Sequence, residues 1–228
     1  MILDRLAPAG RRRRLAGQVP PGPLRTYLET PPPGPGTDVT RLPLLALDLE
    51  TTGLDPRRDA ILSAGFVPLD GLEITLSGSD EILCRADVPV GQSAAVHGLT
   101  DDELRSGVAL DELVQRIAEA LTGRVLLAHH APLETGFLTA AAQRLFGVPF
   151  PAAVVDTMEL QRRLLGQAHE AAIPPGALRL PTARAHLGLP RHRAHRALGD
   201  AVAAAELYLA QVARLGGGKP MTLRALQR

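Results

Sequence analysis

The feature that most limits how this chain can fold is a short apolar run, residues 44–49, that meets acidic side chains at its end. Asp48 and Glu50 alternate with Leu47 and Leu49, and side chains on a β-strand alternate between the two faces of a sheet. The run therefore predicts a buried strand with both carboxylates on one face. Adjacent carboxylates repel each other unless a cation lies between them, and such oxygen ligands suit Mg²⁺ or Mn²⁺. The alternative is a strand end with two solvated acids.

A second acidic site lies near the end of the chain, in residues 195–200 (HRALGD). His195 and Asp200 are five residues apart, so they would not share one face of a helix. We expect His195 in the turn before a long helix and Asp200 in the first turns of that helix. Histidine is the side chain best suited to accept a proton from water near neutral pH. The alternative is a polar helix start with an exposed histidine.

The composition indicates a soluble globular protein and excludes several classes. The 228 residues are enough for one domain of moderate size, and 45% of them are hydrophobic. Aromatic residues make up only 3%, so a module that stacks bases on rows of aromatic side chains is not expected. The single cysteine, Cys84, cannot form an internal disulfide, which favours a reducing, cytoplasmic location. We expect neither a membrane span nor a secretory signal, because no apolar run approaches ~20 residues.

Charge and composition divide the chain into three segments. Residues 1–43 hold seven Lys and Arg against three Asp and Glu, a net of +4, so the remainder carries −3 of the overall +1. We predict that residues 1–43 are a basic, Pro/Gly-rich extension that packs poorly, followed by a body over residues 44–215 and a tail over residues 216–228. Arginines 11–14 are interpreted as part of a solvated tail, with a weak contact to phosphate or to a partner protein as the alternative.

The order of elements in the body predicts an α/β fold with a mixed sheet. Apolar and β-branched runs predict strands over residues 44–49, 60–69, 72–84, 124–128 and 152–155. Helical spacing and breakers predict helices over residues 110–121, 132–146, 156–165, 178–187 and 194–215. Asp156 is expected to cap the helix that begins there.

These segments together resemble the DEDDh family of metal-dependent 3′→5′ exonucleases, over residues 44 to about 212. Residues 48–54 (DLETTGL) resemble the first motif of the family, and residues 195–200 resemble its third. Residues 96–100 (VHGLT) resemble a segment typical of the branch that contains the proofreading (epsilon) subunit of bacterial DNA polymerase III. The resemblance implies a ribonuclease-H-like fold, with a five-stranded mixed sheet whose first three strands are antiparallel and with helices on both faces.

The resemblance also implies a mechanism. Four carboxylates would hold two divalent cations, Mg²⁺ or Mn²⁺, and a histidine would act as general base, so that nucleoside 5′-monophosphates are released. Carried over by position, Asp48, Glu50 and Asp200 are metal ligands and His195 is the base.

Three further positions are implied to meet the substrate. The resemblance places His97 near the terminal nucleotide. It places the backbone at Thr51 close to the 3′ end and Leu54 against the last base.

The chain departs from the family in the second motif, which usually reads His-Asn-Ala-x-Phe-Asp. Residues 129–134 read HHAPLE, so the fourth carboxylate is Glu134 and the Asn is replaced by His130. The extra methylene of Glu134 extends its oxygens by roughly 1.5 Å, and Mn²⁺ tolerates such a change better than Mg²⁺. Glu134 would bind directly or through water, and an imidazole from His130 would favour Mn²⁺. The alternatives are a helix-start acid at Glu134 and a polar strand-end residue at His130.

The sequence therefore predicts a 3′→5′ exonuclease that hydrolyses phosphodiester bonds at nucleic-acid 3′ ends, with DNA favoured over RNA. One alternative is an exonuclease acting on RNA or oligoribonucleotides. Another is a nucleic-acid-binding or polymerase-associated module with weakened catalysis, which rests on Glu134. A polymerase or a repair protein is the candidate partner, and the sequence leaves the biological role and the oligomeric state open.

Overall fold

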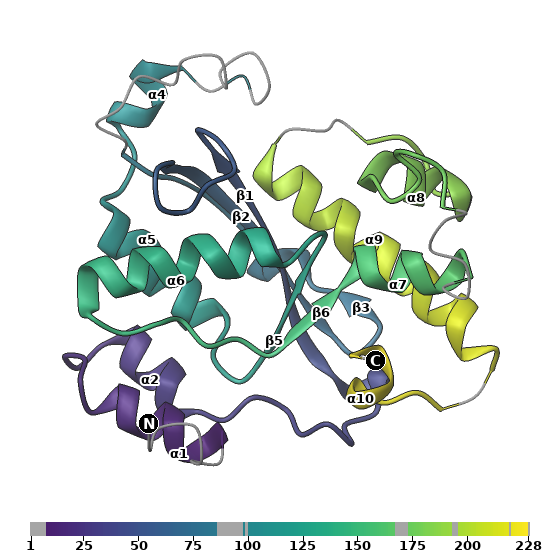
Figure 1. Ribbon diagram of the computed structural model, residues 1–228, viewed down its shortest axis with the longest axis horizontal. Helices are drawn as coiled ribbons and strands as arrows, with labels where there is room; N and C mark the ends of the chain where they lie inside the picture. The colour runs from purple at the N-terminus through teal and green to yellow at the C-terminus, as the bar shows by residue number, and fades with distance from the viewer. Residues whose placement is uncertain are drawn as a thin grey trace.

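The structure is a computed structural model that describes residues 8–85, 98, 100–166, 173–192, 196–218 and 220–227. Two of the candidate site residues, His97 and His195, lie outside the described residues, so the roles expected of them stay predictions. Figure 1 shows a central twisted sheet with helices packed on both of its faces.

The sheet is mixed, as the sequence predicts. Its strands run in the order β3-β2-β1-β5-β6, and β4 also pairs with β2. Strand β1 is antiparallel to β2 and parallel to β5, while β5 is parallel to β6. The strands are β1 (Pro43–Thr51), β2 (Ile61–Asp70), β3 (Glu73–Ile74), β4 (Asp80–Leu83), β5 (Val125–Ala128) and β6 (Val154–Asp156).

One expected strand is divided. Residues 72–84 form β3 and β4, separated by the 3-10 turn η3 (Leu76–Gly78), rather than one continuous strand. Pro68 on β2 lies against this turn, because a Cβ atom at Gly78 would come 2.8 Å from Pro68 Cγ. The backbone of Thr75 donates to the Pro68 carbonyl, but Pro68 has no N–H with which to continue the ladder.

Alternation along β1 supplies both halves of the core. Leu45 and Leu47 belong to the cluster that includes α5 and α6, while Leu44 and Ala46 belong to the cluster that includes α7, α9 and α10. The helices of the body are α4 (Asp101–Arg105), α5 (Leu110–Ala120), α6 (Pro132–Phe146), α7 (Thr157–Leu164), α8 (Leu180–His186), α9 (Ala197–Gly216) and α10 (Leu223–Leu226). Within the described residues, no helix has the length and apolar character that crossing a membrane requires.

The N-terminal segment differs from the poorly packed extension that we expected. It forms α1 (Pro8–Ala16) and α2 (Pro23–Glu29), which lie at the end of the molecule opposite α4 (Figure 1). Leu24, Tyr27 and Leu28 are buried in the same core cluster as α5. The C-terminal tail also packs, since Leu223 and Leu226 join the other cluster. Whether the domain boundaries fall at residues 43 and 215 stays a prediction.

Arg12 is the residue that fixes α1 on the body. Its Nη1 donates to the Pro151 carbonyl at 2.8 Å, and its Nη2 donates to the carbonyls of Tyr27 and Thr30 at the end of α2. The guanidinium also lies 4.4 Å from the centre of the Tyr27 ring, which stacks on Phe150 at 4.8 Å. An arginine in this position combines hydrogen bonds, a cation–π contact and a favourable position at a helix C-terminus.

We expect Arg12→Ala to lower the free energy of unfolding by about 1–3 kcal/mol, because it leaves buried carbonyls without a donor. The neighbouring Arg13 is exposed, so Arg13→Ala is the matched control and should change stability by less than about 0.5 kcal/mol. Denaturant unfolding of both variants measures the difference. Equal stabilities would show that α1 is not held to the body as described.

Candidate metal and active site

Three acidic side chains meet above one face of the sheet. Asp48 and Glu50 come from β1, and Asp200 comes from the first turn of α9. One carboxylate oxygen from each of the three lies within 4.8 Å of the others. The site therefore brings together residues that are 150 positions apart in the chain, as the two sequence motifs predict.

Gly65 on β2 makes this meeting possible. It pairs directly with Asp48 across the antiparallel ladder, so both residues face α9. A Cβ atom at Gly65 would lie 1.9 Å from the backbone nitrogen of Leu198 and 2.1 Å from the carbonyl carbon of Ala197. The start of α9 thus rests on the bare backbone of β2, which brings Asp200 down to the level of Asp48.

Glu134 contributes a fourth acid close to this group. It lies in the first turn of α6 with only 1% of its surface exposed, and its Oε2 atom has no hydrogen-bond partner among the described residues. Among those residues, the tight group of oxygens contains only the other three acids. The charge of Glu134 nevertheless helps to raise the pKa of Asp48, so the two side chains are near enough to interact electrostatically.

Burial and mutual repulsion make the site unfavourable for negative charge. Burial, followed by the charges of Glu134, Asp200 and Glu50, raises the pKa of Asp48 well above its usual range. Burial, then Asp200 and Glu81, raises the pKa of Glu50 to about 7. For Glu134, burial is the main cause and raises the pKa to about 8.

This donor set fits divalent cations. Hard carboxylate oxygens converge from β1 and α9 and repel each other without a counter-charge. The Oε2 atom of Glu134 is also buried and has no partner in the described structure. A bound cation would remove the repulsion and satisfy that oxygen. The described residues therefore bring together three of the four metal ligands that the sequence predicts, and the part of Glu134 stays a prediction.

The raised pKa values predict how stability depends on pH. Between the usual carboxyl pKa of about 4.3 and the folded values of about 7 and 8 for Glu50 and Glu134, the folded state binds more protons than the unfolded state. The free energy of unfolding of the metal-free protein should therefore fall as the pH rises from about 5 to about 8. Added Mg²⁺ or Mn²⁺ should reverse the fall.

Thermal unfolding in a chelator from pH 5 to pH 8 measures this dependence. Asp48→Asn should flatten it, because the variant removes one of the repelling charges. Glu119 is exposed on α5, so Glu119→Gln is the control and should keep the slope of the wild type. A melting temperature that rises with pH in all three proteins would contradict this electrostatic description.

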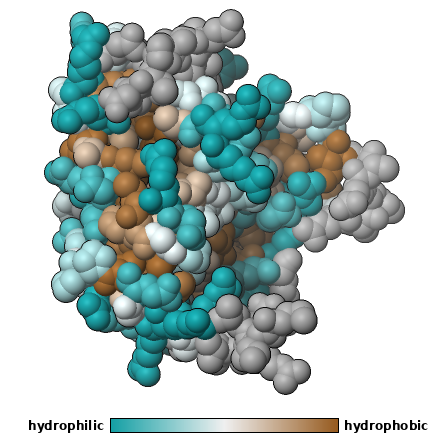
Figure 2. Space-filling view, turned by 60° about the vertical axis from the view of Figure 1, so that its left-hand side comes forward, coloured by the Kyte–Doolittle hydropathy of each residue, from teal (hydrophilic) through white to brown (hydrophobic). Residues whose placement is uncertain are grey.

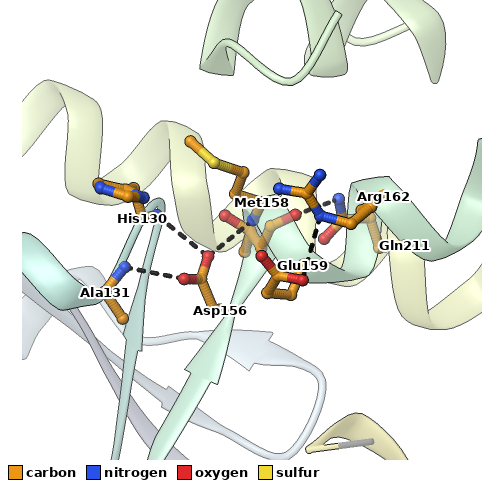
Figure 3. Close-up of polar contacts among 8 residues, drawn as sticks. His130, Ala131, Asp156, Met158, Glu159, Arg162 and Gln211 are labelled. Carbon is orange, nitrogen blue, oxygen red and sulfur yellow. Dashed lines mark hydrogen bonds and ion pairs between the residues drawn. The ribbon is translucent and has the colours of Figure 1, made fainter. Parts of the chain in front are cut away.

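Asp156 organises the loop that precedes Glu134. Its carboxylate accepts hydrogen bonds from the backbone nitrogens of Met158 at 2.8 Å, His130 at 3.0 Å and Ala131 at 2.9 Å (Figure 3). It therefore caps α7, as the sequence predicts, and also ties the end of β6 to the start of α6. Glu134 is placed by this connection.

The two histidines of the second motif have different roles. The ring of His129 is partly buried, with Nδ1 2.8 Å from Thr157 Oγ1 and Nε2 2.8 Å from the Leu178 carbonyl. These contacts link the end of β5 to the start of α7 and to the chain before α8. His130 is exposed and has a φ angle of 79°. Asn and His both adopt such left-handed backbone more readily than most residues, so His130 fits the backbone at the position where the family motif has Asn. A contribution of the His130 ring to the metal stays a prediction.

The end of β1 and the loop that follows it carry two of the expected substrate contacts, Thr51 and Leu54. The Oγ1 atom of Thr51 donates to the Gly53 carbonyl at 2.6 Å, and Leu54 is 81% exposed. Asp59 stabilises the loop by accepting from the backbone nitrogen of Asp55 at 2.8 Å. The exposed side chain of Leu54 is accessible to a ligand. The substrate-binding roles of Thr51 and Leu54 remain predictions.

Two residues beside this site, Glu81 and His192, were not predicted from the sequence. Glu81 on β4 pairs with Gly65 and therefore lies in the same row as Asp48. Its carboxylate accepts from Arg196, the residue before α9, at 2.7 Å. His192 lies 2.7 Å, through its Nε2, from Oδ1 of Asp200. The only signal for His192 is the tandem HRAHRA of residues 192–197; Glu81 carries none, because its position depends on how β4 pairs.

A large groove elsewhere does not contain this chemistry. It has a volume of about 1020 Å³ and runs along α6 between Ala131 and Arg144. None of the three clustered acids lines it. Figure 2 shows one face of the molecule, on which apolar side chains gather in a band between hydrophilic ones. The groove is therefore distinct from the cluster of the three acids.

Comparison with known proteins agrees with the geometry. The exonuclease family RNase_T matches residues 45–208. The chain belongs to the DEDDh exonuclease family. It is 32% identical over 168 residues to the DNA polymerase III subunit epsilon of Treponema pallidum, which covers 74% of this chain and 75% of that protein. It is also 32% identical over 175 residues to a DNA polymerase III subunit epsilon-like protein of Rhodobacter capsulatus, covering 76% of this chain.

Several of the relatives are much longer than the region that this chain matches. It spans 24% of the Rhodobacter protein and 11% of the PolC-type DNA polymerase III of Thermotoga maritima, to which it is 28% identical over 165 residues. Among solved structures, it resembles E. coli exonuclease I in complex with a dT13 oligonucleotide, with a TM-score of 0.67 at 18% identity, over 78% of this chain and 43% of that one. At this identity the likeness concerns the fold, and it supports the ribonuclease-H-like architecture.

Proposed function

We propose that this protein is a 3′→5′ exonuclease that removes nucleoside 5′-monophosphates from DNA 3′ ends with two divalent cations. The observation that carries the proposal is the convergence of Asp48, Glu50 and Asp200 within 4.8 Å, with buried Glu134 beside them. Carboxylates gathered at such a cost to the fold need a counter-charge. Membership of the exonuclease family suggests that the substrate is a phosphodiester at a nucleic-acid end.

Each of the four acids has a place in this proposal. Asp48, Glu50, Glu134 and Asp200 would hold the cations, Mg²⁺ or Mn²⁺. The bound cations would supply Lewis-acid stabilisation of the negative charge that develops on the phosphate and on the leaving oxygen. The convergence of Asp48 and Glu50 from β1 with Asp200 from α9 supports this proposal, and the effect of the Glu134 charge on the pKa of Asp48 supports the inclusion of Glu134.

The remaining residues would handle the substrate and the proton. His195 is proposed as the general base that takes a proton from the attacking water. The backbone at Thr51 would approach the 3′ end, Leu54 would pack against the last base, and His97 would lie beside the terminal nucleotide. The exposure of Leu54 supports its part, because 81% of its surface is available to a base.

DNA is favoured as the substrate by the names of the relatives. They include DNA polymerase III subunits epsilon and PolC-type DNA polymerases, and exonuclease I is known in complex with DNA oligonucleotides. A polymerase or a repair protein in the cytoplasm is therefore the proposed partner. The alternative enzyme acts on RNA or oligoribonucleotides, and the alternative from another class is a binding module with catalysis weakened by Glu134.

Hydrolysis of a 5′-labelled single-stranded oligonucleotide separates these functions. With DNA and Mg²⁺ or Mn²⁺ we expect a ladder of shortening products and mononucleotides, and slower release from RNA of the same sequence. Asp48→Asn should lower the rate by at least about 10²-fold, as expected when charge stabilisation is lost. Glu73 is exposed on β3, so Glu73→Gln should retain the full rate. Binding without hydrolysis under all conditions would favour the binding module.

Substitution of Glu134 tests whether it is the fourth ligand. Glu134→Asp restores the residue of the family and should retain activity while narrowing the difference between rates in Mg²⁺ and Mn²⁺. Glu134→Gln keeps the size but removes the charge, so it should lose most of the activity. Wild-type rates for Glu134→Gln with both metals would identify Glu134 as a helix-start acid only.

A further inference from the structure

Asp200 is held by a histidine that the family motif does not include. The Nε2 atom of His192 lies 2.7 Å from Asp200 Oδ1, and the two side chains are only 14% and 12% exposed. Because a carboxylate offers only lone pairs, the imidazole nitrogen is the donor in this contact. The contact is thus a short, largely buried hydrogen bond to one of the three clustered acids.

The position of His192 is set by a buried arginine on α8. Arg184 is 2% exposed and donates to the Ala203 carbonyl of α9 at 2.7 Å and to the Glu206 carboxylate at 2.7 Å. The same guanidinium donates to the Pro190 carbonyl at 3.1 Å. Arg184 therefore fastens both α8 and the chain that leaves it onto α9, two residues before His192.

The return of the chain after α8 strengthens this attachment. The backbone nitrogen of Leu189 donates to the Arg184 carbonyl at 3.0 Å, so residues 184–190 are closed on themselves as well as on α9. His192 consequently reaches Asp200 from a supported backbone. Asp200 itself lies on α9, the start of which packs closely against β2 at Gly65.

We propose that His192 is a positioning residue that orients the Asp200 carboxylate for cation binding. A ligand oxygen that is already oriented loses less freedom when the metal binds, and partners behind a metal ligand strengthen binding for this reason. This role needs the N–H group of His192 and its place against Asp200, not contact with the substrate. The inference rests on the proposed metal site.

Calorimetric titration of the full chain with Mn²⁺ tests the role without measuring catalysis. His192→Ala should weaken Mn²⁺ binding by about 10- to 100-fold, the range found when the partner of a metal ligand is removed. His192→Gln keeps an N–H donor and should recover most of the affinity. His186 on α8 lies 3.0 Å from Gln161 Nε2, outside the acidic cluster, so His186→Ala is the control for loss of a hydrogen-bonded histidine and should bind as the wild type does.

A second readout distinguishes positioning from general loss of structure. The hydrolysis rate of His192→Ala should approach the wild-type rate at saturating Mn²⁺, because its defect is in affinity. Mn²⁺ affinity within threefold of wild type for His192→Ala would overturn the proposal, and so would a rate that saturating Mn²⁺ does not restore. Asp200→Asn is measured in parallel. If Asp200→Asn also binds Mn²⁺ normally, the proposed metal site itself fails, which separates that failure from an error about His192 alone.

Discussion

Helix α9 rests directly on the backbone of β2 at Gly65, and the acidic site depends on that contact. Any Cβ atom there would overlap the backbone of Leu198 and Ala197, so a side chain would lift the helix from the sheet. Because Gly65 pairs with Asp48, the closest approach occurs where the carboxylates lie. Asp200 follows Leu198 by two residues on α9, so this close approach brings its carboxylate near those of β1.

The charged form of this site destabilises the fold when no cation is bound. Burial and like charge raise the pKa values of Asp48, Glu50 and Glu134, and one oxygen of Glu134 has no partner among the described residues. Active sites commonly carry such unfavourable arrangements, which the rest of the fold must offset. Here the offset comes from two apolar clusters on opposite faces of the sheet.

Much of this could be predicted from local sequence. The alternation at Asp48 and Glu50 predicted their shared face, and the helix expected over residues 194–215 placed Asp200 in an early turn. Other features depend on pairing between distant elements, which local periodicity does not encode. Arg12 looked like one member of a solvated basic run, yet its contacts with Pro151 and Tyr27 bury it. The contact of His192 with Asp200 likewise depends on how Arg184 holds the preceding chain on α9, which the local sequence does not show.

The central claim is that the acids of β1, α6 and α9 form one divalent-cation site. Anomalous diffraction at the manganese edge, from crystals of the full chain soaked in Mn²⁺, tests that claim most directly. The account predicts anomalous peaks within coordination distance of Asp48, Glu50 and Asp200, about 2.0–2.6 Å from their oxygens, with Glu134 bound directly or through a water. Well-ordered crystals in which these carboxylates bind no manganese, or in which manganese lies only elsewhere, would contradict it.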